Sequence, residues 1–437
     1  MSANTQERPP PVPTKQHAAF FRQSGWLMVA NIAGGAMTLG VHFLSKRIPE
    51  TQYSIYGTLL MVAACLPTIP LQMMFAQQTA GGMARGHERQ LAGMIRQGWL
   101  WTLILWIAAA ALILLFQGRI VHRWELTDPI ALWVTLLTVL LSLWTPIFAG
   151  VLQGRQDFFS LGWSMILGSA CRLGVAVLLV IGLSSGATGM MTGALVGSFV
   201  GLGIALWQIR DLLWMPSLPF DGRGLFRQVM PLTFGFGVCQ FMFTSDTMYA
   251  KAFFTGNEMA PYVAAGTLSR GLLWMVLPLA TVMFPKIVHS TVRSEKSSLM
   301  GVVLAGTAVL SLCCGLGLCL LGPWVIRLVF PSDYVVRTIA LIPWYVGSMV
   351  PLALANVLIN DLMARARFRV VPVIVILALA YGFTLPYVLN HFSHRLETVL
   401  QTLGVFNVLL LAAAAWAAFG DNQRQKAEGA AVPAGRG

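Results

Sequence analysis

The stretch IALWVTLLTVLLSLWTPIFAGVL, from Ile130 to Leu152, decides the fold of this chain. It runs for 23 residues without a single Asp, Glu, Lys, Arg or His. A helix needs roughly 20 such residues to cross the hydrocarbon core of a bilayer. A strand of an outer-membrane barrel would instead alternate in polarity over about ten residues, and this stretch does not alternate. We therefore expect it to form a transmembrane helix.

Comparable apolar runs recur along the whole chain. Hydrophobic residues make up 57% of it and charged residues only 10%, whereas soluble domains carry about 25% charged residues. This composition cannot supply the charged surface of a soluble fold, so we expect an all-α integral membrane protein with about twelve transmembrane helices. The expected spans are 24–45, 54–77, 97–117, 130–152, 159–183, 186–209, 229–253, 260–284, 299–321, 338–360, 370–390 and 397–419.

The basic residues of the loops indicate the orientation of these spans. If the N-terminus is cytoplasmic, 19 Lys and Arg residues lie on the cytoplasmic side and 8 on the opposite side. Loops rich in Lys and Arg stay in the cytoplasm, so we expect both termini there, in a multi-pass protein of the bacterial inner membrane. The formal net charge of +13 is thus explained by loop residues that set the orientation of the spans, and we expect no binding of nucleic acid. The eight residues on the opposite side are Lys46, Arg47, Arg119, Arg123, Lys251, Arg327, Arg337 and Arg395.

The first half of the chain resembles the second at a shift of about 205 to 210 residues. Six spans separate the two copies, so both have the same orientation, and an axis along the membrane normal relates them. We therefore expect two pseudo-symmetric six-helix bundles with a substrate path between them. The matches pair Phe21-Arg22-Gln23 with Phe226-Arg227-Gln228, Lys46 with Lys251, Gly57-Thr58-Leu59 with Gly266-Thr267-Leu268, and Pro146 with Pro351.

This repeat predicts the domain organisation. A cytoplasmic tail (1–23) precedes an N-terminal bundle (24–209), a cytoplasmic loop (210–228) connects it to a C-terminal bundle (229–419), and a disordered cytoplasmic tail (420–437) follows. Prolines should bend equivalent spans in the two halves, because each removes a backbone hydrogen bond. They are Pro67 and Pro70 in the second span, Pro146 in the fourth, Pro278 in the eighth, and Pro343 and Pro351 in the tenth. These bends are either hinges for rocking between two access states or static kinks.

Three charged residues lie inside expected spans: Arg172, Asp246 and Arg270. A charge at the bilayer centre costs roughly 2.5 to 3.5 kcal/mol on insertion scales, so such residues need a reason. One interpretation is a cationic cleft in which the two arginines attract an anionic head group such as a phosphate. Asp246 would then pair with Arg270 or titrate as part of ion coupling. The other interpretation is an internal salt bridge that docks helices.

Two lysines near span ends belong to the same set of candidate pathway residues. Lys251 follows Asp246 along the seventh span, and Lys46 ends the first span. Either side chain could instead extend to the membrane surface, as long basic side chains do. His42 and Asn31 in the first span are interpreted as packing residues.

The chain shows no enzyme constellation. It has no paired carboxylates in a plausible cleft and no phosphate-binding loop that would hydrolyse ATP. Its six cysteines all lie in apolar runs without the spacing of a zinc site. We therefore expect no catalytic residues, no metal and no cofactor.

Two segments carry a family resemblance. Gly266-Thr267-Leu268-Ser269-Arg270 with Pro278 and Pro285, and Leu152-Gln153-Gly154…Phe158 before Arg172, resemble the multidrug/oligosaccharidyl-lipid/polysaccharide exporter superfamily, in particular its polysaccharide flippase branch. The resemblance implies a V-shaped pair of bundles and alternating access. It implies transport of a lipid-linked oligosaccharide, with an anionic lipid-linked saccharide as substrate, membrane lipid as surroundings, and a polymerase or glycosyltransferases as partners.

Four alternatives remain open. A cation-coupled multidrug exporter of the same superfamily is disfavoured because many members carry a carboxylate in the first span, and this span has none. The lipid II flippase group often has extra C-terminal helices that this chain lacks. A major-facilitator transporter should show an Asp-Arg motif in the loop between spans 2 and 3, which here reads GMARGHER from Gly82 to Arg89. A non-transporting scaffold in an envelope polysaccharide synthesis complex is the fourth alternative.

Overall fold

A computed structural model describes residues 14–126, 128–218, 222–271, 299–365 and 367–430. All regular elements in these ranges are helical, which confirms the all-α prediction. They are α1 (Thr14–Gly40), η1 (Val41–Arg47), α2 (Glu50–Ala64), α3 (Ile69–Ala84), α4 (Glu88–Leu115), α5 (Gln117–Arg123), α6 (Pro129–Gly154), α7 (Phe158–Val177), η2 (Leu178–Gly182), α8 (Gly186–Gln208), α9 (Arg210–Trp214), α10 (Gly222–Phe253), α12 (Leu299–Val329), η3 (Ser332–Tyr334), α13 (Val335–Ala364), η4 (Phe368–Val370), α14 (Val371–His391) and α15 (Leu396–Ala430). Residues 256–271 are helical as well.

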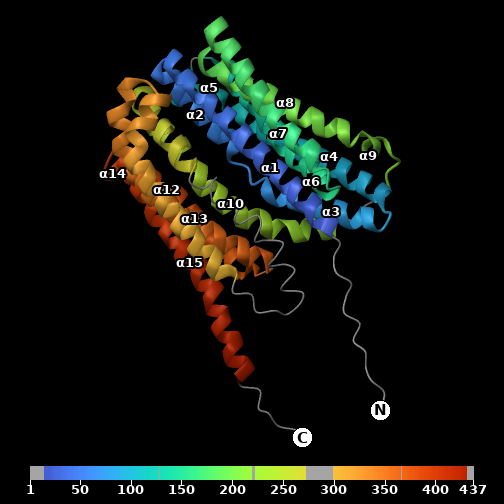
Figure 1. Cartoon of the computed structure of the whole chain (residues 1–437). Helices are drawn as coiled ribbons and strands as arrows, with labels where there is room; N and C mark the ends of the chain where they lie inside the picture. Colours follow the sequence, from blue (N-terminus) through green and yellow to red (C-terminus); the bar gives the residue numbers. More distant parts are fainter. Residues whose placement is uncertain (1–13, 127, 219–221, 272–298, 366, 431–437) are drawn as a thin grey trace, which may run out of the picture.

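The helices form two bundles that together make a V (Figure 1). One bundle contains α1 to α9 and the other α10 to α15. The bundles meet at the end where η1, α5 and the last turn of α12 lie, which we call the closed end. They splay apart toward the end where α1 begins and α15 finishes, which we call the tail end (Figure 1). The expected six-plus-six organisation is consistent with this arrangement.

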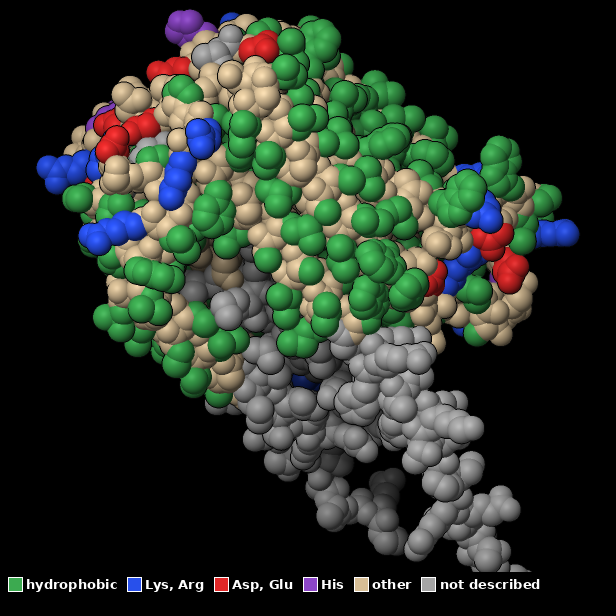
Figure 2. All heavy atoms as spheres, turned by 45° about the horizontal axis from the view of Figure 1, so that its top comes forward, with side chains coloured by type: hydrophobic (Ala, Val, Ile, Leu, Met, Phe, Trp, Pro, Cys, Tyr) green, Lys and Arg blue, Asp and Glu red, His purple; other side chains and the backbone are tan. Residues whose placement is uncertain are grey.

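Ten helical stretches of the described residues are long and apolar enough to span a membrane, and they overlap ten of the twelve predicted spans. The seventh predicted span corresponds to α10, which has 32 residues and carries Gln240 and Asp246 along its length. The eighth, 260–284, is helical up to residue 271 and otherwise lies outside the described residues. Charged side chains gather at two ends of the visible face, with an apolar band between them (Figure 2).

The second span is broken, as its prolines predict. Helix α2 ends at Ala64 and α3 begins at Ile69. Pro67 lies in the break, and Pro70 occupies the first turn of α3, where a missing N–H costs nothing. Pro146 and Pro351 lie inside continuous helices. The predicted bend at Pro278 lies outside the described residues.

Several boundaries differ from those expected. Helix α1 begins at Thr14 and α15 continues to Ala430, so 420–430, for which we expected disorder, is helical. The segment contains Gln, Arg, Lys, Glu and Ala, which all favour helix and can extend an existing one without a new nucleus. Similarly, α9 and the first turns of α10 occupy much of the expected connecting loop at 210–228.

The buried core explains why one end is closed. One apolar cluster lies entirely in the N-terminal bundle, between α3, α4, α6, α7, α8 and α9. The larger cluster crosses both bundles and includes Val41 and Tyr53 from one, and Ile326 and Phe330 from the other. The rings of Tyr53 and Phe330 lie 5.8 Å apart in an edge-on arrangement. The closed end therefore shares a single core, which holds the two bundles together there.

Candidate functional site

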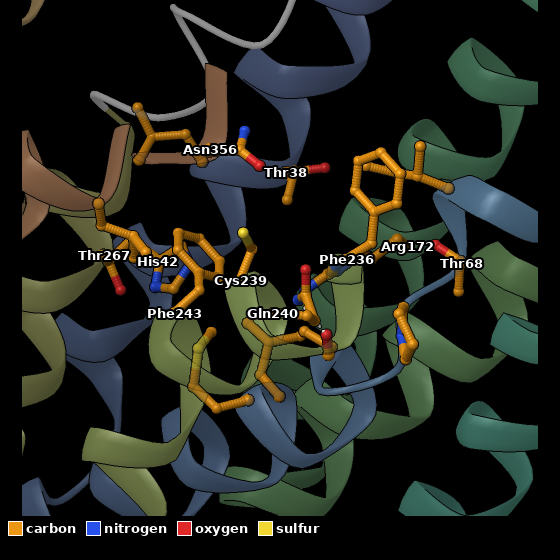
Figure 3. Close-up of a pocket in the computed structure, with 17 residues that line it drawn as sticks. Thr38, His42, Thr68, Arg172, Phe236, Cys239, Gln240, Phe243, Thr267 and Asn356 are labelled. Carbon is orange, nitrogen blue, oxygen red and sulfur yellow. Dashed lines mark hydrogen bonds between the residues drawn. The ribbon is translucent and has the colours of Figure 1, made fainter. Parts of the chain in front are cut away.

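A cavity of about 330 Å³ lies between the two bundles (Figure 3). Its wall comes from α1, η1, the break after α2, and α7 on one side, and from α10, the 256–271 helix and α13 on the other. Two phenylalanines and a set of polar side chains line it. The polar ones are Thr38, His42, Thr68, Arg172, Gln240, Thr267 and Asn356. Among the described lining residues Arg172 is the sole permanent charge, and no carboxylate is present.

Helix packing directs Arg172 toward this cavity. A small-residue face on α8 allows α7 and α8 to approach closely. A Cβ added to Gly193 would lie 2.6 Å from the carbonyl oxygen of Arg172, and one added to Gly197 would lie 2.6 Å from the Cβ of Arg172. With its backbone held against α8, the side chain extends away from that helix, and its Nη2 donates a 2.8 Å hydrogen bond to the Tyr56 hydroxyl.

The guanidinium of Arg172 still has free donor capacity. Its Nε is buried, and none of the described residues offers it an acceptor. Although the Arg172 side chain as a whole is only partly buried, an unpaired buried N–H is costly, so an acceptor that reaches it is favoured. A phosphate oxygen is a suitable acceptor because guanidinium and phosphate form short, charge-assisted hydrogen bonds. This side chain can therefore bind an anion in the cavity.

Beside Arg172, the N-terminal wall carries a buried histidine. The Nδ1 of His42 lies 2.8 Å from the Tyr53 hydroxyl, and its ring lies 5.7 Å from that of Tyr56. The sequence suggested a packing role for His42. The structure gives it packing partners and also places it on the cavity wall.

The opposite wall is uncharged and carries three polar side chains, Gln240, Thr267 and Asn356, among apolar ones. Gln240 of α10 donates a hydrogen bond to the carbonyl of Ala64, at the break between α2 and α3. Asn356 of α13 accepts a 3.3 Å bond from Asn360 one turn later. Amides of this kind hydrogen-bond hydroxyl and acetamido groups without requiring a charge. The cavity thus combines one cation with neutral hydrogen-bonding groups.

Asp246 and Arg270 form an ion pair with each other, an arrangement that both interpretations of the sequence allowed. Nη2 of Arg270 lies 2.6 and 2.7 Å from the two carboxylate oxygens of Asp246. Both residues are buried, with 0% and 2% of their surface exposed, and neither is among the residues that line the cavity. Tyr262 and Tyr345 also donate hydrogen bonds to Asp246. A role of this pair in the transport path stays a prediction.

The two lysines lie at the closed end and not along the cavity. Lys251 is buried and forms a 3.1 Å ion pair with Glu125, so its side chain does not extend to the membrane surface. Lys46 is exposed and donates to the carbonyls of Arg327 and Leu328. Their part in a substrate path stays a prediction from the sequence.

Three residues of this arrangement were not identified from the sequence. Gln240 and Asn356 are polar interruptions in apolar spans, a pattern that could have flagged them. Glu125 offers a weaker clue, since an acid in a turn beside a span end is common. Within the described ranges, no cluster of three or more His, Cys, Asp or Glu side chains could hold a metal ion.

The fold has clear relatives among solved structures. An inward-facing multidrug resistance MATE family transporter of the MOP superfamily is similar, with a TM-score of 0.72, 13% identity, and coverage of 92% of this chain and 96% of that one. A lipid II flippase MurJ in an inward closed conformation is similar with a TM-score of 0.65 and 13% identity, and the match covers 90% of this chain and 86% of that one. A MOP superfamily transporter from Pyrococcus furiosus is similar with a TM-score of 0.64 and 13% identity, and the match covers 90% of this chain and 94% of that one. These likenesses establish the MOP fold.

The sequence itself also matches a family model. No curated protein matches the chain. The model described as lipid II flippase MurJ matches residues 30–414, which is most of the chain and includes both bundles and the cavity between them. A continuous match of this extent shows the family, and with it a transporter of the MOP superfamily and not an enzyme. The chain therefore belongs to the lipid II flippase MurJ family.

Proposed function

We propose that this protein moves a lipid-linked oligosaccharide, the precursor of a surface polysaccharide such as an exopolysaccharide, from the cytoplasmic to the outer leaflet of the bacterial inner membrane. Transport would proceed by alternating access of the cavity between the bundles. Arg172 is the observation that carries the proposal. It is the permanent charge on the described wall of that cavity, and its Nε lacks an acceptor.

Each part of such a substrate finds suitable surroundings. The phosphate that links lipid to sugar would receive charge-assisted hydrogen bonds from Arg172. Neutral sugars would receive hydrogen bonds from Gln240 and Asn356 and pack against Phe236 and Phe243, which also line the cavity. The lipid chain would remain in the bilayer, because transferring it into a polar cavity would expose apolar surface to water.

Lipid II is the second candidate substrate, favoured by the description of the family model that matches the chain. It shares the lipid phosphate linkage, so Arg172 would serve it in the same way. The polysaccharide precursor rests on the motif resemblance around Leu152–Phe158 and Gly266–Arg270. A cationic drug fits less well, because a lone guanidinium in the cavity would repel it.

The test is to delete the gene and quantify polyprenyl-linked saccharides in the membrane by mass spectrometry. Accumulation of a complete polysaccharide unit, with loss of the surface polymer, supports the proposal. Accumulation of lipid II instead favours the second candidate. If neither accumulates and the cells become sensitive to cationic drugs, the flippase proposal fails and the drug-exporter alternative replaces it.

A complementation step separates a transporter from a scaffold. Wild-type protein should restore the polymer, whereas an Arg172→Ala variant of equal abundance should not. A scaffold that recruits a polymerase or glycosyltransferases would tolerate the loss of this cavity charge. Orientation is part of the same proposal: the tail end, where α1 begins and α15 finishes, would face the cytoplasm. A green fluorescent protein fused after α15 should then fluoresce, while an alkaline phosphatase fusion should be inactive.

A further inference from the structure

Two lysines at equivalent positions of the repeat each reach across to the opposite bundle. Lys46 lies at the end of the first span, and Lys251 lies near the end of α10, with a shift of 205 residues between them, the same shift that relates Phe21 to Phe226. Both lie at the closed end. The repeat therefore places the same residue type at the same place in each half.

Lys251 forms the buried contact of the two. Its side chain is 1% exposed and its Nζ lies 3.1 Å from the Oε2 of Glu125, which belongs to the N-terminal bundle. The same carboxylate oxygen accepts a 3.1 Å hydrogen bond from the backbone N–H of Gly256. Glu125 has a positive φ of 52°, a strained conformation for a residue with a side chain. The turn after α5 is thus held in a form that directs this carboxylate toward the C-terminal bundle.

Lys46 forms the exposed contact. Its Nζ donates to the carbonyl oxygens of Leu328 at 2.8 Å and of Arg327 at 3.3 Å, in the last turn of α12. The C-terminus of a helix carries partial negative charge and unpaired carbonyls, so it attracts a cation. This contact needs no carboxylate.

The acceptors are also related by the repeat. Helix α12 is the third span of the C-terminal half. In the N-terminal half the third span is α4, the short helix α5 follows it, and Glu125 lies just after α5. Each lysine therefore lies near the end of the first span of its own half, and it binds the segment at the closed end where the third span of the other half finishes or has just finished. The two contacts are reciprocal about the pseudo-twofold axis.

We propose that Lys46 and Lys251 form a reciprocal clasp that keeps the closed end shut and whose release opens the cavity to that side. Among the described residues, the two ion pairs between bundles, Glu125–Lys251 and Glu50–Arg337, both lie at this end. The clasp rests on the alternating-access part of the proposed function. The two contacts differ in strength, because the Lys251 side chain is buried and meets a half-exposed carboxylate, whereas the Lys46 side chain is exposed and meets only carbonyl oxygens.

A native cysteine allows the test. Cys239 lines the cavity, so an impermeant maleimide supplied from the closed-end face labels it only when that end opens. The other five cysteines would be replaced by alanine, and labelling would be measured in intact cells. Inside-out vesicles supply the same reagent from the tail end. The measurement does not depend on substrate identity, so failure of the clasp and failure of the proposed function are distinguishable.

The variants are Lys251→Met, Glu125→Gln and Lys46→Met. We expect labelling to become about tenfold faster for Lys251→Met, severalfold faster for Glu125→Gln, which keeps an acceptor for Gly256, and about twofold faster for Lys46→Met. Arg395→Met is the control, because Arg395 is an exposed cation at the same end.

Two results would overturn the clasp. One is labelling of Lys251→Met and Glu125→Gln at the rate of wild type. The other is equal acceleration by Arg395→Met, which would make the effect one of net charge. A reversed pair, Glu125→Lys with Lys251→Glu, should slow labelling again relative to Lys251→Met. A return to slow labelling in this double variant would show that the single variants opened the closed end and did not merely misfold.

Discussion

The guanidinium of Arg270 binds both carboxylate oxygens of Asp246 from a single nitrogen, Nη2, at 2.6 and 2.7 Å. Two further donors, the hydroxyls of Tyr262 and Tyr345, bind the same carboxylate at 2.8 and 3.1 Å. The remaining Nε of Arg270 donates to the carbonyl of Phe243. All partners lie in the C-terminal bundle, so this network ties α10 to α13 and to the helix that contains Arg270.

Removing one partner of this pair should destabilise the protein. Arg270→Ala leaves the Asp246 carboxylate buried without its cation, a change that costs about 3–5 kcal/mol in comparable pairs. The double variant Arg270→Met with Asp246→Asn removes both charges. Its loss of stability should therefore be much smaller than the summed losses of the single variants Arg270→Met and Asp246→Asn. Thermal unfolding in detergent would measure this. Single variants as stable as wild type would show that the pair does not stabilise the bundle.

Arg172→Ala should show the opposite pattern, with little loss of stability and a large loss of transport per molecule. None of the described residues offers an acceptor to its Nε, so folding gains little from that donor. Hydrogen bonds to charged groups contribute about 1.5–3 kcal/mol, which corresponds to a roughly ten- to hundredfold weaker interaction with a phosphate. Polymer synthesis normalised to protein abundance would be measured. Arg172→Lys keeps the charge and should retain part of the activity.

The membrane fold could be predicted from the sequence because bilayer thickness and backbone hydrogen bonding leave few choices. The spans, the repeat and the broken second span follow from apolar run lengths, from matches such as Lys46 with Lys251, and from Pro67. The helical segment 420–430 could not be predicted in this way, since polar residues fit either a helix or a disordered tail. Helix extension from an existing span decided it.

The candidate site was only partly predictable. Apolar surroundings identify Arg172, Asp246 and Arg270 as costly charges, but the sequence does not say which of them faces a cavity. That distinction depends on rotation of each helix about its axis, which neighbouring small residues such as Gly197 determine. The pairing of Lys251 with Glu125 could not be predicted from the sequence for another reason. It joins a helix end to a turn of the opposite bundle.

Gly57 should be essential for closing the two bundles. A Cβ at this position in α2 would overlap both Cγ atoms of Val263 in the C-terminal bundle. Valine is stiff at χ1 and cannot rotate away easily. Gly57→Ala should therefore push the bundles apart at the closed end and accelerate labelling of Cys239 from that face, even with both lysines in place.

Two variants control this experiment. Gly35→Ala adds the same methyl group to α1, where no atom of the described residues lies within 4 Å of the new atom, and should leave labelling unchanged. Val263→Ala removes the atoms that Gly57→Ala would overlap, so the double variant should regain slow labelling. A double variant that labels as fast as Gly57→Ala alone would contradict the steric explanation.

The ion pair between Arg155 and Asp211 should make stability depend on pH at the tail end. Hydrogen bonds from Arg155, at 2.9 and 3.1 Å, hold the pKa of the Asp211 carboxyl below its ordinary value of 3.8. A lowered pKa in the folded state means that the pair stabilises the protein above the ordinary pKa, and that this contribution disappears as the pH falls through the lowered value. The Asp211 side chain is 65% exposed, so solvent screening limits the contribution to about 0–1 kcal/mol. Asp211→Asn should therefore lower the Tm slightly at pH 7 and converge with wild type at a pH below the lowered pKa. In an Arg155→Gln background the same substitution should change nothing at either pH, and a persistent difference there would assign the effect to a group other than this pair.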